Sequence, residues 1–206
     1  MDLRKLGVWY FLDGLSTEDS IRAAQKIESL GYGTLWLPET VGKDPLTTSS
    51  LLLSVTTKLN LATGIVNIYH REPGVMLAAQ KTLAEQSQNR FILGMGVSHK
   101  PLVEGVRGLE YGPPVKTMRD YLSKMEASPY TGIASSEKPT TLIAALGPKM
   151  LELAAEKTDG AHPYFTSPEH TEFARKILGK DKKLCVCLLY TSPSPRDQRG
   201  SRMASS

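Results

Sequence analysis

Four polar residues stand just beyond short apolar runs of the sequence, where a side chain is free to meet a ligand. They are Glu39, Asn67, Ser98 and His99. The imidazole of His99 can exchange a proton near neutral pH, and the carboxylate of Glu39 is placed to line a pocket. Structural roles stay open beside these, because a loop histidine often makes only surface hydrogen bonds and Glu39 can equally pair with a lysine or cap a helix.

A phosphate-binding turn is indicated by Gly147-Pro148-Lys149-Met150, which follows an apolar run and opens a helical segment. Glycine at the end of a strand lets a ligand approach the backbone. Proline at the first helical position leaves free N–H groups beyond it, which bind phosphate together with the helix dipole. Lys149 adds a positive charge. The same residues also suit an ordinary strand-to-helix turn, so both interpretations stand.

Three glycines lie inside apolar runs. Gly94-Met-Gly96 resembles the start of G-x-G-x-x-G, but the third position is His99 and the glycines do not open a helix, which excludes a dinucleotide fingerprint. Small residues here leave room for a flat ring against the strand ends, and tight packing accounts for them too. Gly64, next to Ile65, predicts a bulge in its strand.

Strands and amphipathic helices alternate along the chain and must position these residues. The expected strands are residues 6–12, 34–37, 59–66, 91–97, 140–146 and 160–165. Strands that alternate with helices form a parallel sheet, and runs that are apolar throughout indicate a sheet covered on both faces. We expect residues 180–183 to form a solvated loop after the last helix.

Two closures suit such a sheet, an open doubly wound sheet or an eight-stranded barrel of about 250 residues. Six strand–helix units in 186 residues extrapolate to the barrel's length. We therefore expect an α/β fold, a (β/α)8 TIM barrel truncated after about six β/α units, over residues 1–186. In a barrel the chemistry lies at the carboxyl ends of the strands, which gathers Glu39, Asn67, Ser98, His99 and Gly147 at one rim.

Composition excludes several classes of function. The net charge is only +4, and the basic residues are scattered, which argues against nucleic acid as a partner. No apolar run approaches the roughly 20 residues that span a bilayer, and the charged start leads into strand-like sequence, so we expect a cytoplasmic protein. His70, His162 and His170 show no metal-site spacing, and Cys185 is expected to be a small buried residue.

Residues 187–206 differ from the rest of the chain. They hold five serines, two prolines and three arginines, and residues 187–197 resemble the translation of a transposon-type sequencing adapter. We therefore expect a disordered tail of non-biological origin, with a natural disordered tail as the alternative.

The sequence resembles the luciferase-like flavin and deazaflavin oxidoreductases, most closely the branch that uses the deazaflavin coenzyme F-420. The motifs that carry the resemblance are LGVWYF, LGYGTLWLPE, LATGIVNIY, NRFILGMGVSH, YGPPVKTMRDYL and AALGPKMLELAAEKTDGAHPYF, in that order. The resemblance implies an (α/β)8 barrel with the coenzyme at the carboxyl ends of the strands. It assigns coenzyme binding to Gly64, Ile65, Asn67, Gly94, Gly96, Ser98 and the turn Gly147, Pro148, Lys149 and Met150.

Particular residues acquire roles from this resemblance. It implies that Gly147–Met150 contacts the coenzyme phosphate, and that Gly64–Ile65 is a non-proline cis peptide behind the coenzyme ring. His99 aligns with a position that holds a catalytic acid–base carboxylate in some relatives, and Glu39 is the second catalytic candidate. Thr40 stands where sugar-phosphate dehydrogenases of the family have a catalytic histidine, which argues against that activity.

The function expected from this resemblance is hydride transfer between a deazaflavin coenzyme and a small organic substrate, in a protein whose intact form is a homodimer. The alternatives are an FMN-dependent luciferase-like monooxygenase and a non-catalytic flavin-binding or inactive fragment. Nothing in the residues separates deazaflavin from FMN, since both rings need the same flat slot and phosphate cradle. The substrate is set by loops that vary between barrels.

Overall fold

Strands and helices alternate along residues 6–188, the part of the chain that this computed structural model describes. The strands are β1 (Gly7–Trp9), β2 (Thr34–Leu37), β3 (Asn60–Thr63), β4 (Val66–Asn67), β5 (Phe91–Gly96), β6 (Thr140–Ile143), β7 (Gly160–Ala161) and β8 (Lys183–Leu184). The helices are α1 (Thr17–Ser29), α2 (Pro45–Ser54), α3 (Pro73–Gln86), α4 (Pro114–Ala127), α5 (Pro148–Lys157) and α6 (Pro168–Leu178). Two short turns of helix, the 3-10 helix η1 (Ile68–His70) and the π-helix η2 (Pro101–Val106), lie in the connections.

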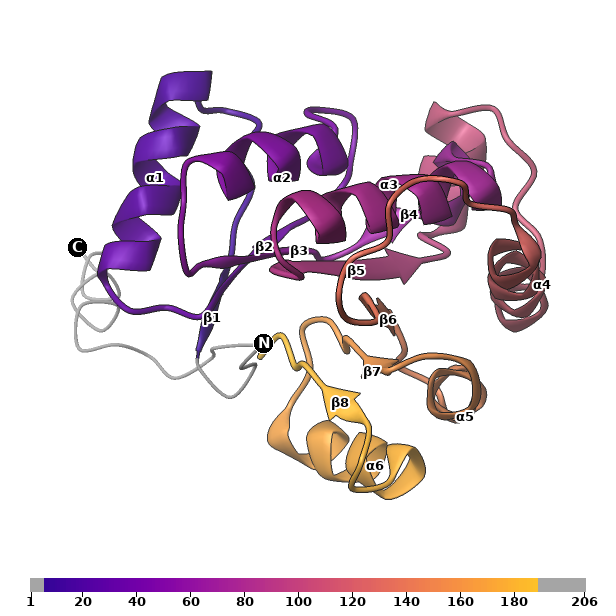
Figure 1. The fold of residues 1–206 in the computed structure, drawn as a ribbon. Helices are drawn as coiled ribbons and strands as arrows, with labels where there is room; N and C mark the ends of the chain where they lie inside the picture. Colours follow the sequence, from indigo (N-terminus) through magenta and orange to yellow (C-terminus); the bar gives the residue numbers. More distant parts are fainter. Residues whose placement is uncertain (1–5, 189–206) are drawn as a thin grey trace, which may run out of the picture.

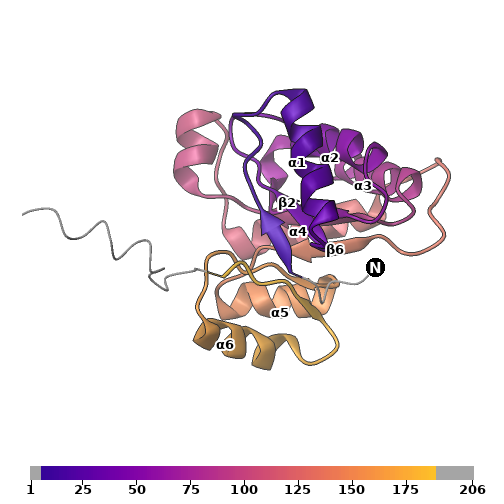
Figure 2. The ribbon, with the colours of Figure 1, turned by 90° about the vertical axis from the view of Figure 1, so that its left-hand side faces the viewer.

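All the strands belong to one parallel sheet in the order β1-β2-β3-β5-β6-β7-β8, with β4 also pairing with β5. The sheet curls, and the helices lie outside the curl, with α1, α2 and α3 at the top of the view and α5 and α6 at the bottom (Figure 1). Figure 2 shows the same arrangement after a quarter turn, with α1–α3 above the strands and α5 and α6 below. The predicted fold class, a truncated barrel of the TIM type, is confirmed.

Side-chain caps explain where the helices begin. Ser16, Asp44, Glu72 and Ser167 each accept a hydrogen bond from a backbone amide in the first turn of α1, α2, α3 and α6 respectively. Proline occupies the first turn of every α-helix after α1, where its missing N–H costs nothing. Such caps and prolines are sequence signals typical of helix starts.

The last strand departs from the expectation. Residues 180–183 were expected to be a solvated loop, but Lys183 begins β8, which pairs in parallel with β7. The described chain therefore holds a short seventh barrel strand after its sixth strand–helix unit. Pairing continues past it, since the amide of Cys187 donates to the carbonyl of Pro163 and that of Thr166 to Cys187. Of the predicted tail, residues 187–206, the structure describes only 187 and 188, and the rest lies outside the described residues.

Two hydrophobic clusters stabilise the sheet from its two faces. The larger lies between the outer face and the helices. The smaller lies inside the curl, where Trp36, Ala62, Ile92 and Leu142 pack with Trp9 and Cys185. Trp9, Trp36, Ala62 and Ile92 are register partners on successive strands, so they form one layer of inward side chains, as barrels do.

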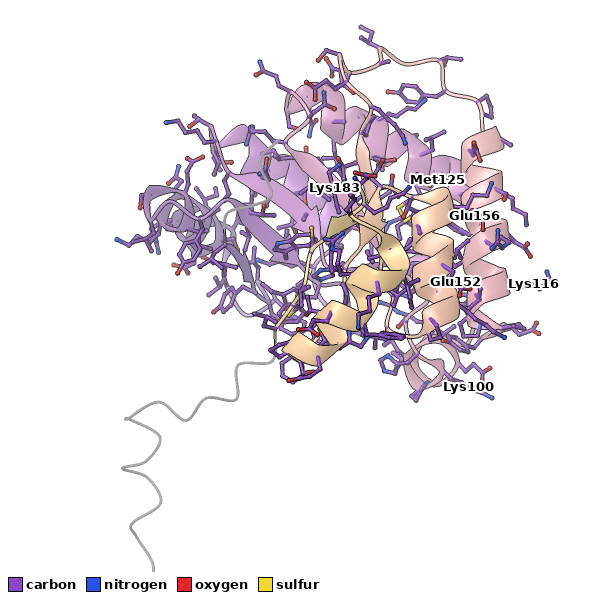
Figure 3. All side chains as sticks on the ribbon, turned by 90° about the horizontal axis from the view of Figure 1, so that it is seen from below. Lys100, Lys116, Met125, Glu152, Glu156 and Lys183 are labelled. Carbon is purple, nitrogen blue, oxygen red and sulfur yellow. The ribbon has the colours of Figure 1, made fainter. Side chains whose placement is uncertain are left out.

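Neighbouring helices also contact each other on the outer surface. Figure 3, seen from below, shows α4 and α5 side by side, with Glu156 of α5 on the side that faces α4. The guanidinium of Arg119 in α4 donates to both carboxylate oxygens of Glu156, at 2.7 and 2.9 Å. Within residues 6–188, no helix is both long and apolar enough to cross a bilayer.

The third barrel strand is interrupted between β3 and β4. The peptide bond between Gly64 and Ile65 is cis, as the family resemblance implied. Just before the break, the hydroxyl of Thr63 accepts from the amide of Gly94 and donates to its carbonyl, both at 2.8 Å. A Cβ on Gly94 would lie 2.0 Å from the carbonyl oxygen of Thr63, so only glycine fits this position of β5.

Replacing Gly94 by alanine is therefore expected to destabilise the fold by about 1–3 kcal/mol or more, because a buried backbone must shift to admit the methyl group. Urea denaturation followed by circular dichroism measures the change. Gly14→Ala is the matched control, since no atom lies within 4 Å of a Cβ there. Equal midpoints for the two variants would show that β5 does not need glycine at residue 94.

Candidate functional site

A cavity of about 860 Å³ opens at the carboxyl ends of the strands. Its wall is mostly apolar and comes from the segments that follow β1, β2, β3, β5, β6 and β7. The predicted site residues that line it are Glu39, Gly64, Ile65, Gly96, Ser98, His99, Gly147, Pro148, Lys149 and Met150. Residues up to 111 positions apart in the chain are thus brought to one place, as the barrel geometry predicts.

Two predicted coenzyme contacts, Asn67 and Gly94, do not lie in the cavity wall. Gly94 instead packs against the backbone carbonyl of Thr63. Asn67 is 1% exposed, and its side chain accepts from the amide of Tyr69 and approaches His70 Nε2 at 3.1 Å. Both residues therefore build the wall from behind, and their contact with a coenzyme stays a prediction.

Glu39 is tied into a network beside the cavity. Its Oε1 accepts from Arg71 at 2.6 Å, and its Oε2 accepts from the backbone amide of Asn67 at 2.6 Å. The same guanidinium also pairs with Asp44, the cap of α2. The Glu39 and Arg71 side chains are only 8% and 13% exposed. Of the roles left open, pairing with a basic residue is the one observed, and the partner is an arginine.

The charges of this network stabilise one another. Burial by itself would lower the pKa of Arg71, but the hydrogen bonds and charges of Glu39 and Asp44 raise the pKa above its usual value. The sequence offered no sign of this pair, because the two partners stand 32 positions apart on different connections. Glu39 is thereby held in one orientation at the cavity edge.

Ser98 and His99 form the turn between β5 and η2. Ser98 has a φ of 55°, in the left-handed region, and its carbonyl accepts from the hydroxyl of Tyr111. The carbonyl of His99 accepts from the amides of Leu102 and Val103, so its backbone starts η2. The imidazole of His99 is exposed and lies in the cavity wall. It is thus accessible from solvent for proton exchange.

The turn from β6 into α5 combines three features of an anion site. No side chain caps α5, unlike α1, α2, α3 and α6. No atom lies within 4 Å of a Cβ built on Gly147, which leaves open space over the backbone. Lys149 is exposed in the first turn of α5 and lines the cavity. Backbone N–H groups at a free helix start attract anions.

Sequence reasoning missed a second support for this turn. His170, in the first turn of α6, donates from Nε2 to the carbonyl of Leu146 at 2.8 Å. That carbonyl immediately precedes Gly147, so α6 steadies the segment that starts α5. The sequence position of His170 gives no sign of this contact, because its partner lies 24 positions away. Within residues 6–188, no group of three or more His, Cys, Asp or Glu is placed to hold a metal ion.

His162 is the most buried histidine of the site and was given no role from the sequence. It follows β7, is 3% exposed and lines the cavity. Its ring stacks on Trp36 with centroids 4.4 Å apart and planes 6° from parallel. Nδ1 lies 2.7 Å from the carbonyl oxygen of Cys185. Burial lowers the pKa of His162, although the hydrogen bond to Cys185 opposes that effect, so the ring is neutral near neutral pH.

Cys185 is a packing residue, as expected, although it is only partly buried. It packs with the inner cluster of the sheet, and burial raises the pKa of its thiol to about 11. A thiol with so high a pKa is protonated near neutral pH and is a poor nucleophile.

The comparison with known families agrees with this geometry. Residues 12–178, well over half of the chain, match the family described as luciferase-like monooxygenase. The chain belongs to this family. The resemblance stated from the sequence motifs is thereby confirmed.

One curated relative is named for the coenzyme F420. The chain is 29% identical over 194 residues to a putative coenzyme F420-dependent oxidoreductase of Mycobacterium tuberculosis, covering 80% of this chain and 55% of that protein. The chain therefore spans about half the length of this relative.

Solved structures of luciferase-like enzymes share the fold. The coenzyme F420-dependent tetrahydromethanopterin reductase of Methanopyrus kandleri superposes with a TM-score of 0.72 at 19% identity, over 89% of this chain and 65% of that one. The oxygenating constituent of 3,6-diketocamphane monooxygenase from Pseudomonas putida, a complex with FMN, superposes with a TM-score of 0.68 at 14% identity, over 84% and 61%.

The buried pair of Glu39 and Arg71 predicts a strong coupling in this luciferase-like chain. Arg71→Met is expected to cost about 3–5 kcal/mol of unfolding free energy, because it leaves a buried carboxylate without its partner. Adding Glu39→Gln to Arg71→Met should recover part of the loss. Urea denaturation of the two single variants and the double variant measures the coupling. Arg119→Met, which breaks an exposed pair, should change stability far less; additive effects at residues 39 and 71 would contradict the prediction.

The neutral His162 predicts a loss of stability in mild acid. The unfolded chain binds a proton on this histidine below about pH 6.5, whereas the folded chain, with its lowered pKa, does not until lower pH. Stability should therefore fall as pH decreases below about 6.5, and His162→Phe should make the slope of Tm against pH shallower between pH 7 and pH 5. His99→Phe is the control at an exposed histidine. Identical slopes in wild type and His162→Phe would refute a buried neutral imidazole.

Proposed function

We propose that the cavity binds a deazaflavin coenzyme of the F-420 type and that the protein transfers a hydride between this coenzyme and a small organic substrate. The observation that carries the proposal is one cavity with two complementary ends. One end is the uncapped start of α5 at Gly147, and the other is an apolar slot beside Gly64 and Ile65. A phosphate attached to a flat ring needs both.

The residues of the cavity suit such a coenzyme. Gly147 and Lys149 would hold its phosphate through backbone amides and a charged side chain. The ring would lie against Ile65, Gly96 and Ala144. A Cβ on Gly96 would come within 2.7 Å of the Ile65 side chain and 3.3 Å of the Ala144 Cβ, so glycine keeps this part of the slot flat.

When bound, a deazaflavin supplies a carbon centre that gives or accepts a hydride. The protein's residues supply the surroundings. The aromatic side chains of Trp9, Phe11 and Tyr164 line the cavity and make its wall apolar. The exposed imidazole of His99 is the residue we assign to exchange the proton that accompanies hydride transfer. Glu39, whose carboxylate is held by Arg71, orients the cavity edge.

The relatives favour deazaflavin and keep FMN as a second candidate. The Mycobacterium tuberculosis relative is named a putative coenzyme F420-dependent oxidoreductase, and the Methanopyrus kandleri enzyme is a coenzyme F420-dependent reductase. The Pseudomonas putida neighbour is a complex with FMN. An FMN-dependent monooxygenase would use the same phosphate turn and slot, and it would differ by consuming oxygen.

Titration of the 206-residue chain with F-420 and with FMN separates these candidates. Quenching of coenzyme fluorescence should give a lower Kd for F-420. Tighter binding of FMN, together with oxygen consumption after reduction, would support the monooxygenase instead. If neither ring binds, the proposal is wrong.

Lys149→Ala provides the structural part of the test. The variant should bind FMN several-fold more weakly and riboflavin, which lacks the phosphate, as before, because Lys149 serves only the phosphate end. Lys180→Ala removes an exposed lysine before β8, at the opposite end of the strands, and should leave both affinities unchanged. Equal losses for FMN and riboflavin in Lys149→Ala would place the phosphate elsewhere.

A further inference from the structure

His162 presents an unused hydrogen-bond acceptor to the cavity. The carbonyl oxygen of Cys185, 2.7 Å from Nδ1, can only accept, so Nδ1 carries the hydrogen. In a neutral ring Nε2 is then an acceptor. Nε2 is buried and, among residues 6–188, has no hydrogen-bond partner. Buried polar atoms are nearly always paired, so a free one in a cavity wall indicates a missing donor.

The position of this acceptor is fixed at the part of the cavity wall formed by Trp9, Gly64 and His162, which we call the floor. A Cβ on Gly64 would lie 3.2 Å from Nε2, which puts Nε2 directly beside the bulge that ends β3. The stacking of the imidazole on Trp36 and its hydrogen bond to Cys185 hold the ring in this orientation. The neighbouring indole N–H of Trp9 is already donated to the carbonyl of Gly64 at 2.7 Å. The floor therefore offers one fixed acceptor.

We propose that His162 Nε2 accepts a hydrogen bond from the imide N–H in the pyrimidine portion of a tricyclic redox ring, and so selects rings that carry this donor. The inference rests on the proposed function. Oxidised flavins and deazaflavins share this one ring N–H, which lies between two carbonyl groups. The slot beside Gly64 is otherwise apolar, so a donor that enters it finds no other partner among the side chains that line the floor.

A ring blocked at this nitrogen tests the proposal directly. The probes are FMN and FMN methylated at the imide nitrogen, titrated into the 206-residue chain by fluorescence quenching. The wild type should bind the methylated ring about tenfold more weakly, the loss that corresponds to one buried hydrogen bond. In His162→Phe the two rings should bind almost equally, since phenyl keeps the stacking on Trp36 but accepts nothing.

The choice of phenylalanine separates hydrogen bonding from crowding. Phenyl is at least as bulky as imidazole, so a purely steric effect of the methyl group would persist in His162→Phe. Lys180→Ala, at the opposite end of the strands from the cavity, is the control and should keep the tenfold preference. Persistence of the preference in His162→Phe would overturn the proposal.

A second readout needs no variant. Nitrogen NMR of the histidine-labelled wild type should show Nδ1 protonated and Nε2 unprotonated without ligand, and only Nε2 should shift when FMN is added. A protonated Nε2 in the free protein, or binding of both rings with equal affinity, would overturn the role of His162 while leaving the proposed coenzyme site intact. Absence of quenching by either ring would instead overturn the coenzyme site itself, and this inference with it.

Discussion

The packing of residues 63–65 against their neighbours is the constraint on which the site depends. The amide of Gly64 donates to the carbonyl of Leu37, and its carbonyl accepts from the indole N–H of Trp9. The carbonyl of Ile65 accepts from the backbone amide of Glu39. The segment thus links the first three barrel strands at their carboxyl ends, while Thr63 locks it onto β5 through Gly94. Because the backbone groups named here are paired, the bulge stands as a firm wall, and the cavity has a defined floor beside it.

Polar groups around this wall divide into those already satisfied and those left free. Each carboxylate oxygen of Glu39 accepts a hydrogen bond, one from Arg71 and the other from the Asn67 amide, so its side chain is held in place at the cavity edge. The start of α5 has no side-chain cap, and Nε2 of His162 has no hydrogen-bond partner among the described residues. A ligand that satisfies both must present an anionic group at one end and an N–H donor at the other.

Local signals in the sequence predict the helices and the rim, whereas distant pairings escape them. Residues such as Ser16 and Asp44 are local signals for helix starts, and barrel geometry places the loops after the strands at one rim. Strand ends were overextended: residues 144–146 are apolar because they line the cavity, not because they continue β6. Arg71 and His162 were missed since their roles come from partners 32 and 23 positions away. The spacing of residues within one segment therefore could not reveal either contact.

The two free ends of the cavity differ in how water and salt act on them. Lys149 and the start of α5 are exposed, so their attraction to an anion is screened by salt. This attraction raises the association rate and the affinity for any anionic ligand. His162 is buried, so a hydrogen bond to it is little affected by salt and is lost entirely when the donor is absent. In the proposed site, the charge of Lys149 would therefore attract any phosphate-bearing ring, and discrimination between rings would depend on His162. The buried acceptor would then decide which chemical edge a coenzyme of this shape must present.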